Sequence, residues 1–231
     1  MNRNSPTYGV LAGGGAVSAQ RNRVLRNTYA LLALSLVPTV LGAWIGVTTG
    51  ITTSLGMGMS AMVFLGGAFA FMFAIEKTKN SAAGVGVLLG FTFFMGLMLS
   101  RMLAAVLGFS NGASLIMTAF GGTAAVFFSM ATLATVVKRD LSNLSKFLFI
   151  GAILLLVAGV INIFVQSSAL MLTLSVAAIG IFSAFMLVDV KRVIDGGETN
   201  YISATLAIYL DIYNVFQSLL MLLGVFGGER D

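Results

Sequence analysis

Seven long apolar segments, separated by short polar ones, follow one another along the chain. A helix needs about 20 mostly apolar residues to cross a bilayer, and such segments run approximately over 28–48, 55–75, 82–107, 112–137, 147–167, 169–190 and 203–226. The polar stretch between the fifth and sixth, VQSSAL, is so short that it predicts either a tight turn or one long bent helix. Its Gln166, Ser167 and Ser168 favour the turn. The pattern predicts an all-α polytopic membrane protein, folded as a compact seven-helix transmembrane bundle.

The segments that connect these helices alternate between basic and neutral. Basic residues lie before the first helix and after the second, fourth and sixth, whereas the stretch TTGITTS after the first helix is uncharged. Of the 13 lysines and arginines, only Arg101 and Arg230 fall on the neutral side. Because basic loops stay in the cytoplasm, we expect a cytoplasmic N-terminus and a C-terminus on the far side. Arg101 is expected near the far interface, with its charged end snorkelling to the polar region.

Composition removes several classes of protein. The chain of 231 residues is 58% hydrophobic and 9% charged, whereas a soluble domain carries about 25% charged residues. A soluble fold is therefore excluded, and the lipid bilayer is the first partner. The net charge of +5 is explained by the topology of the loops, so we expect no binding of nucleic acid.

The N-terminal stretch differs from the rest of the chain. Residues 1–25 are polar, rich in glycine and contain Pro6, which predicts a mobile cytoplasmic tail. Residues 26–228 form the predicted transmembrane domain. Its many glycines indicate close packing of helices, and Gly86 with Gly90 offers the alternative of a seam between two copies. We expect a monomer or a weak homo-oligomer.

The chain contains no cysteine and no histidine. This absence excludes disulfides, thiolate metal sites and the side chain that normally titrates near neutral pH. A rhomboid-type serine protease would need a histidine, and a retinal protein would need a lysine in the seventh helix. Prolines occur only at 6 and 38, so the PAL motif of intramembrane aspartyl proteases is missing. We expect a protein that is not an enzyme.

Two aspartates stand out inside the last two helices. An ionised side chain at bilayer depth costs about 3 kcal/mol on insertion scales, so Asp189 and Asp211 require an explanation. Asp211 lies roughly 12 Å into the seventh helix, at about 1.5 Å per residue. Asp189 lies just before the cytoplasmic end of the sixth helix, and the short DGGETN loop makes these two helices antiparallel neighbours. The hypothesis is that the two carboxyl groups face each other.

A facing pair of carboxyl groups has a specific chemistry. Two such groups in a low dielectric cannot both ionise cheaply, so they share one proton and titrate in two coupled steps. The same oxygens could hold a cation such as Ca²⁺ in place of that proton. The alternatives are a pairing of Asp189 with Lys191 or Arg192, and a protonated Asp211 bonded to a neighbouring helix. Polar side chains expected to support the pair are Tyr209, Asn214, Lys191 and Arg192.

Four stretches carry a resemblance to a known family: RVLRNTYALLALSL (23–36), GGTAAVFF (121–128), FMLVDVKRVIDGGETNYISATL (185–206) and YLDIYNVFQSLLMLLG (209–224). Together they make the chain resemble the Bax inhibitor-1 (transmembrane Bax inhibitor motif) family, in its bacterial YccA-like branch. The resemblance implies a seven-helix bundle with the last helix near its centre. It also implies that two acids, at the positions of Asp189 and Asp211, gate a pH-sensitive calcium leak.

The resemblance carries a second implication, which is an interaction. The YccA-like branch is associated with the membrane protease FtsH, as substrate and modulator, through a cytoplasmic tail that corresponds to residues 1–25. It places the protein in the bacterial inner (cytoplasmic) membrane and implies no cofactor apart from calcium as a bound or transported ion. One departure stands out, because some members carry an arginine in the second helix near the acidic pair, and residues 55–75 contain no charge.

Overall fold

The computed structural model describes residues 7–229, and it is helical throughout this part of the chain, without a strand. The helices are α1 (Thr7–Thr49), α2 (Met57–Thr78), α3 (Ala83–Leu107), α4 (Gly112–Val136), α5 (Ser142–Val165), α6 (Ser168–Asp195) and α7 (Tyr201–Gly227). Each of the seven has a stretch long and apolar enough to cross a membrane. The predicted fold class and the number of spans are confirmed.

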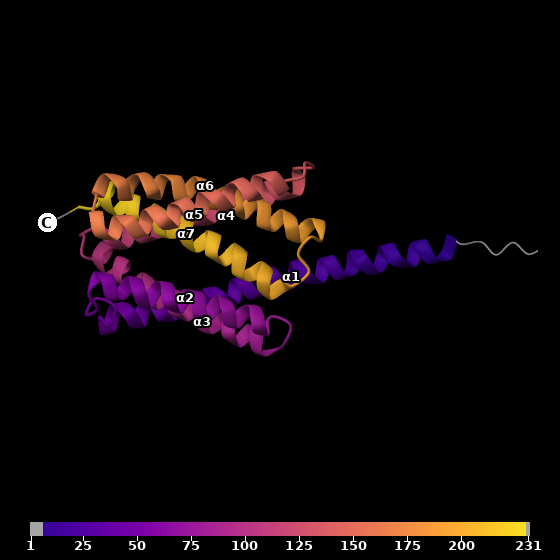
Figure 1. Ribbon diagram of the computed structural model, residues 1–231, viewed down its shortest axis with the longest axis horizontal. Helices are drawn as coiled ribbons and strands as arrows, with labels where there is room; N and C mark the ends of the chain where they lie inside the picture. The colour runs from indigo at the N-terminus through magenta and orange to yellow at the C-terminus, as the bar shows by residue number, and fades with distance from the viewer. Residues whose placement is uncertain (1–6, 230–231) are drawn as a thin grey trace, which may run out of the picture.

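Helix α1 is longer than the sequence predicted. It begins at Thr7, whereas its apolar span begins only at Ala19. The first part of α1 therefore projects from the bundle as a continuous helix (Figure 1). The predicted tail of residues 1–25 is helical from Thr7 onward, and residues 1–6 lie outside the described residues.

A tight turn separates α5 from α6, as Gln166, Ser167 and Ser168 indicated. Gln166 ends α5 in the left-handed region, with a φ of 53°. The Ser167 amide donates to Asn162 Oδ1 at 3.0 Å, and Ser167 Oγ in turn accepts the Leu170 amide at 3.2 Å. These side chains satisfy backbone groups that a helix end leaves free, so the chain reverses within a few residues.

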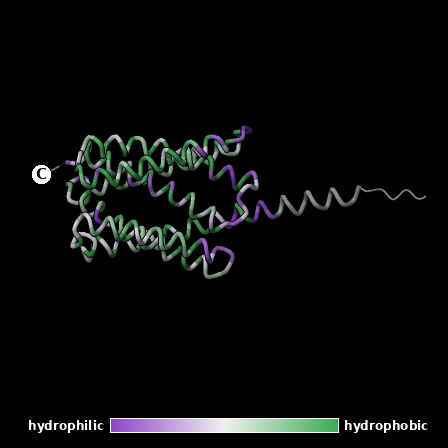
Figure 2. The backbone as a smooth tube through the Cα atoms, in the orientation of Figure 1, coloured by the Kyte–Doolittle hydropathy of each residue, from purple (hydrophilic) through white to green (hydrophobic). Residues whose placement is uncertain are grey.

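The two ends of the bundle differ in polarity. The α2–α3, α4–α5 and α6–α7 connections lie at the end from which α1 projects, where hydrophilic segments gather (Figure 2). We call this the basic end. The α1–α2, α3–α4 and α5–α6 connections lie at the opposite end, which we call the neutral end. The alternation of charges along the sequence thus becomes a separation in space.

Helix α7 occupies the middle of the bundle. It runs between α1, α2 and α3 on one side and α4, α5 and α6 on the other (Figure 1). Its side chains at Tyr209, Val215 and Leu220 are fully buried. A polar residue on the inner faces of α7 is therefore shielded from lipid, which is the condition under which an acid persists at bilayer depth.

Glycines set a close helix crossing, which joins α1 and α3. A Cβ atom at Gly42 would lie 2.1 Å from a backbone oxygen of α3, and one at Gly96 would lie 1.9 Å from a backbone oxygen of α1. Only glycine allows this approach. By contrast, a Cβ at Gly86 would meet nothing within 4 Å, and one at Gly90 would make ordinary contact with Phe71.

Candidate functional site

The structure brings Asp189 and Asp211 together between α6 and α7. Their carboxyl groups lie close enough to interact directly. A carboxylate only accepts hydrogen bonds, so two facing carboxyl groups can bond to each other only when one of them carries a proton. The two acids are therefore placed where a single proton can be shared between two helices.

Asp211 is the more deeply placed member of the pair. Its side chain is 4% exposed, and its Oδ2 atom has no hydrogen-bond partner among the described residues. A buried oxygen without a donor is costly, and it is the kind of atom that calls for a proton or a cation.

Asp189 lies closer to the basic end and is half-buried. The charges of Arg192 and Glu198 act on it from the last turn of α6 and the loop that follows. Lys191 does not pair with Asp189. Its Nζ lies 2.8 Å from Asp195 Oδ2, one turn further along the same helix. Of the two basic partners considered for Asp189, Arg192 is the one whose charge reaches it, without a hydrogen bond.

Helix α7 is fastened to α1 and α3 by hydroxyl groups. The Tyr209 hydroxyl lies 2.9 Å from Thr39 Oγ1 and 3.5 Å from the Thr92 carbonyl oxygen. One turn further, the Tyr213 hydroxyl donates to the Met95 carbonyl oxygen at 3.3 Å. Tyr209 and Tyr213 thus hold α7 on either side of Asp211, and the expected support of the acidic pair by Tyr209 stays a prediction.

Asn214 does not orient Asp211, although it lies one turn away on α7. Its amide donates instead to the Leu210 carbonyl oxygen at 2.7 Å. The side chain also lines a cavity of about 430 Å³ between α2, α5, α6 and α7. The structure thus shows this amide bonded within its own helix, and its support of the acidic pair stays a prediction.

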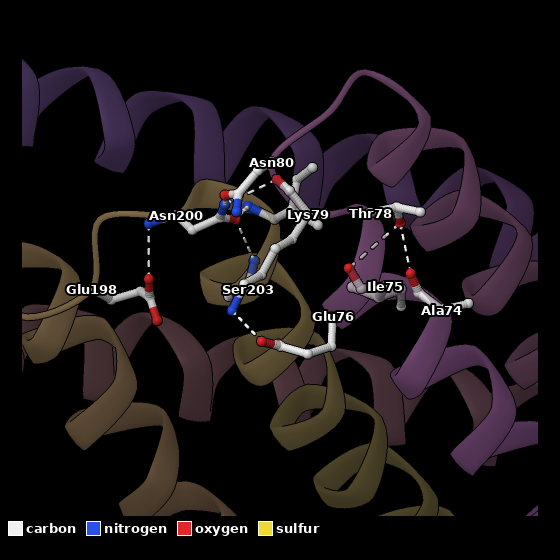
Figure 3. Close-up of polar contacts among 10 residues, drawn as sticks. Ala74, Ile75, Glu76, Thr78, Lys79, Asn80, Glu198, Asn200 and Ser203 are labelled. Carbon is white, nitrogen blue, oxygen red and sulfur yellow. Dashed lines mark hydrogen bonds and ion pairs between the residues drawn. The ribbon is translucent and has the colours of Figure 1, made fainter.

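The contact that fixes the start of α7 was not predicted from the sequence. Asn200 Oδ1 accepts the amides of Ile202 and Ser203 at 2.9 and 3.0 Å and so caps α7. Its Nδ2 donates to the Lys79 carbonyl oxygen at 2.9 Å and to Asn80 Oδ1 at 3.0 Å (Figure 3). One side chain thus ties the α6–α7 loop to the α2–α3 loop. The signal was an asparagine directly before an apolar helix, a typical N-cap.

The pair does not form part of a larger cluster of metal ligands. Within the described residues, no group of three or more aspartate, glutamate, histidine or cysteine side chains lies close enough to hold an ion. Ca²⁺ takes six to eight oxygen ligands in a stable site. Two carboxyl groups supply fewer oxygens than such a site needs, so they suit a cation that passes better than a cation that stays bound.

Comparison with known proteins supports the sequence resemblance. A family model described as inhibitor of apoptosis-promoting Bax1 matches residues 21–228. The Escherichia coli K12 protein named modulator of FtsH protease YccA is 38% identical over 204 residues, 88% of this chain and 90% of the relative. An uncharacterised membrane protein of Vibrio cholerae is 38% identical, covering 89% of this chain and 91% of its own.

The names of these relatives also bear on location. A second Escherichia coli relative, 38% identical over the same 204 residues, is named inner membrane protein YccA. Together with the seven helices that can cross a membrane, this confirms the predicted multi-pass location in a bacterial inner membrane. The match covers nearly every residue of the helical bundle, and the chain belongs to the Bax inhibitor-1 family.

Proposed function

We propose that this protein is a pH-sensitive leak for cations, calcium among them, and that Asp189 and Asp211 form its gate. The observation that carries the proposal is the close approach of the two carboxyl groups, together with an Asp211 Oδ2 that has no hydrogen-bond donor among the described residues. The proton between the two acids links α6 to α7. When the proton leaves, two negative charges face each other in a low dielectric, and the contact becomes repulsive.

The same event creates affinity for the ion. A doubly ionised pair supplies hard oxygen ligands to a divalent cation, which then neutralises the charge that the proton had neutralised. We therefore expect the leak to increase as pH rises through the coupled titration of the pair. The role is not enzymatic, because the two acids bind and release ions without any covalent step.

A flux measurement tests the gate. The purified chain is reconstituted in liposomes that contain a calcium dye, and influx is recorded over a range of pH. Asp211→Asn should abolish the pH dependence of influx, and Asp189→Asn should do the same. Asp195→Asn is the matched control, since Asp195 is an exposed acid of the same helix and should leave the profile unchanged. An influx that ignores pH in the unaltered chain, or equal profiles in all four proteins, would refute the gate.

We propose, as a second function, that the protein binds the membrane protease FtsH and slows its proteolysis. Two observations favour it: a relative 38% identical is named modulator of FtsH protease, and α1 extends beyond its apolar span at the basic end. A helical extension that projects from the bundle provides a cytoplasmic segment that a protease can bind.

Removal of residues 1–18, which precede the apolar span of α1, tests this second function. The truncated chain should be degraded more slowly by FtsH than the full chain and should lose its effect on the degradation of other membrane substrates. Full-length Asp211→Asn serves as a control with an intact extension. Equal turnover of the full and truncated chains in cells that contain FtsH would refute the interaction through this segment.

A further inference from the structure

A cleft opens in the side of the bundle, away from the acidic pair. It measures about 430 Å³ and is lined mainly by apolar side chains of α2, α5, α6 and α7. A smaller cavity of about 190 Å³ lies against it, toward the ends of α2 and α3, and Ala61, Phe64 and Gln217 line both. The two spaces are therefore neighbours, one largely apolar and the other lined by a cation.

The cation is Arg101, two turns before the end of α3. Its Nη1 donates to the Leu55 carbonyl oxygen at 3.1 Å and to Ser60 Oγ at 3.2 Å. An arginine has five N–H donors, and the structure gives those on Nε and Nη2 no partner among the described residues. No acid of the described chain lies within ion-pair distance of Arg101. From the sequence, Arg101 was expected only to snorkel to the interface. In the structure its guanidinium is bonded to the wall of the smaller cavity, and its remaining N–H donors have no partner among the described residues.

The cleft has the depth of one leaflet. On α5, its lining extends from Ala152 to Ile163, eleven residues apart, which corresponds to about 16 Å along a helix. Half of a bilayer's hydrocarbon core is close to this length, at about 15 Å. The polar cavity with Arg101 lies at the neutral end, where headgroups of the adjoining leaflet meet the protein. Arg101 and the cleft thus lie in the same half of the bundle, the half nearer the neutral end.

Gln217 stands at the junction of the two spaces. Its side chain lines both cavities, is exposed, and has no hydrogen-bond partner among the described residues. In hydrocarbon an unsatisfied amide is costly. A phospholipid carries polar ester groups between its phosphate and its chains, and their oxygens accept hydrogen bonds of the kind that this amide donates.

We propose that this composite cavity is a binding site for one anionic phospholipid of the leaflet at the neutral end. The phosphate binds the free donors of Arg101, the ester region faces Gln217, and one acyl chain fills the cleft between α2, α5 and α6. Charge complementarity selects an anionic headgroup, because guanidinium and phosphate match in geometry as well as in sign. A pocket of a few hundred Å³ with apolar walls and few polar groups is typical of a ligand site.

The test is native mass spectrometry of the full-length chain in detergent, titrated with dioleoyl phosphatidylglycerol. We expect one retained lipid per chain, and weaker retention of phosphatidylcholine with the same acyl chains. Arg101→Gln should raise the Kd about tenfold, the order for a lost hydrogen bond to a charged group. Arg101→Lys, which keeps the charge, should lose less. Lipid retention that is equal in the unaltered chain and in Arg101→Gln would overturn the proposal.

A second pair of variants tests the acyl chain. Gly159 lines the cleft, and a Cβ there meets nothing within 4 Å, so Gly159→Leu fills the space without disturbing the fold. Gly180→Leu is its control, because Gly180 is exposed on α6, also meets nothing within 4 Å, and lines neither cavity. We expect loss of lipid in the first variant and normal retention in the second. Displacement of lipid by inorganic phosphate with no effect of Gly159→Leu would overturn the acyl-chain assignment. A change of oligomeric state in Gly159→Leu would assign the cleft to a second copy and overturn it as well.

Discussion

Replacement of Asn200 by alanine should loosen the basic end of the bundle. The side chain caps α7 through two backbone amides, at 2.9 and 3.0 Å. Loss of such a cap costs about 1 kcal/mol. It also donates to the partly buried Lys79 carbonyl oxygen at 2.9 Å, and loss of that bond costs about 1 kcal/mol more. The exposed bond to Asn80 Oδ1 adds little, because water replaces it.

The expected total is therefore about 2 kcal/mol of lost unfolding free energy. For a chain of this size, 1 kcal/mol corresponds to about 2–4 °C in Tm, so Asn200→Ala should lower Tm by about 4–8 °C. Thermal unfolding in detergent, followed by tyrosine and tryptophan fluorescence, measures the shift. Hydrogen exchange at Ile202 and Ser203 should accelerate as well, since Asn200 protects these two amides directly.

Two further variants separate the cap from the bridge between loops. Asn200→Ser keeps a capping oxygen but is too short to reach the Lys79 carbonyl, so it should lose about half as much stability as Asn200→Ala. Asn80→Ala removes only the exposed bond and should change Tm by about 1 °C or less. A Tm for Asn200→Ala within about 2 °C of the unaltered chain would refute this account. Equal losses in Asn200→Ala and Asn200→Ser would refute the separate role of the cap.

Three other predictions follow from the fold and the proposed gate. Gly96→Val should lose about 3 kcal/mol or more in thermal unfolding, because its Cβ would meet backbone of α1, whereas Gly86→Val, open within 4 Å, should be nearly neutral. Hydrogen bonds from the Ser142 hydroxyl and amide lower the pKa of Asp140. Ser142→Ala should raise that pKa toward its ordinary value in a carbon-13 NMR titration. The stability that this acid adds is present above its ordinary pKa and is lost as pH falls through the lowered value; an unchanged pKa would contradict the assignment. Since the chain has no native cysteine, paired spin labels can be placed freely. A rise in pH should change α4–α6 distances more than α3–α7 distances, and the reverse order would contradict the proposed gate.

The seven spans were predictable because each depends on local composition alone. A run of apolar residues must cross the bilayer as a helix, whatever its neighbours do. The contact of Asp189 with Asp211 was predictable for a similar reason, since a short loop forces α6 and α7 to run side by side. The helical extension before Ala19 was missed, because glycine and polar residues suggested a coil. A helix that is already nucleated by the adjoining span extends at lower cost than an isolated one forms.

The tight glycine crossing and the composite cavity could not be predicted, because both depend on which helices pack against each other. Gly42 with Gly46, and Gly86 with Gly90, share the same spacing of small residues, yet only the first pair lies at a tight crossing. Spacing along one helix does not identify the helix that packs against it. The composite cavity was hidden for the same reason. The sequence indicated how far along its helix Arg101 lies. It could not indicate that Arg101 lies near Gln217, because the packing of four helices brings the two residues together.

The gate, if it opens as proposed, moves α6 rather than α7. Helix α7 is held by Tyr209 and Tyr213 to α1 and α3, and by Asn200 to the α2–α3 loop. Among the described residues, the polar side-chain contact of α6 with another transmembrane helix is the approach of Asp189 to Asp211. The other contacts of α6 are apolar packing, which tolerates sliding because it has no direction. Loss of the shared proton therefore removes the directional link of α6 and leaves those of α7 intact. The acid that moves is Asp189, the one nearer the basic end, and its departure leaves Asp211 without its partner on α6.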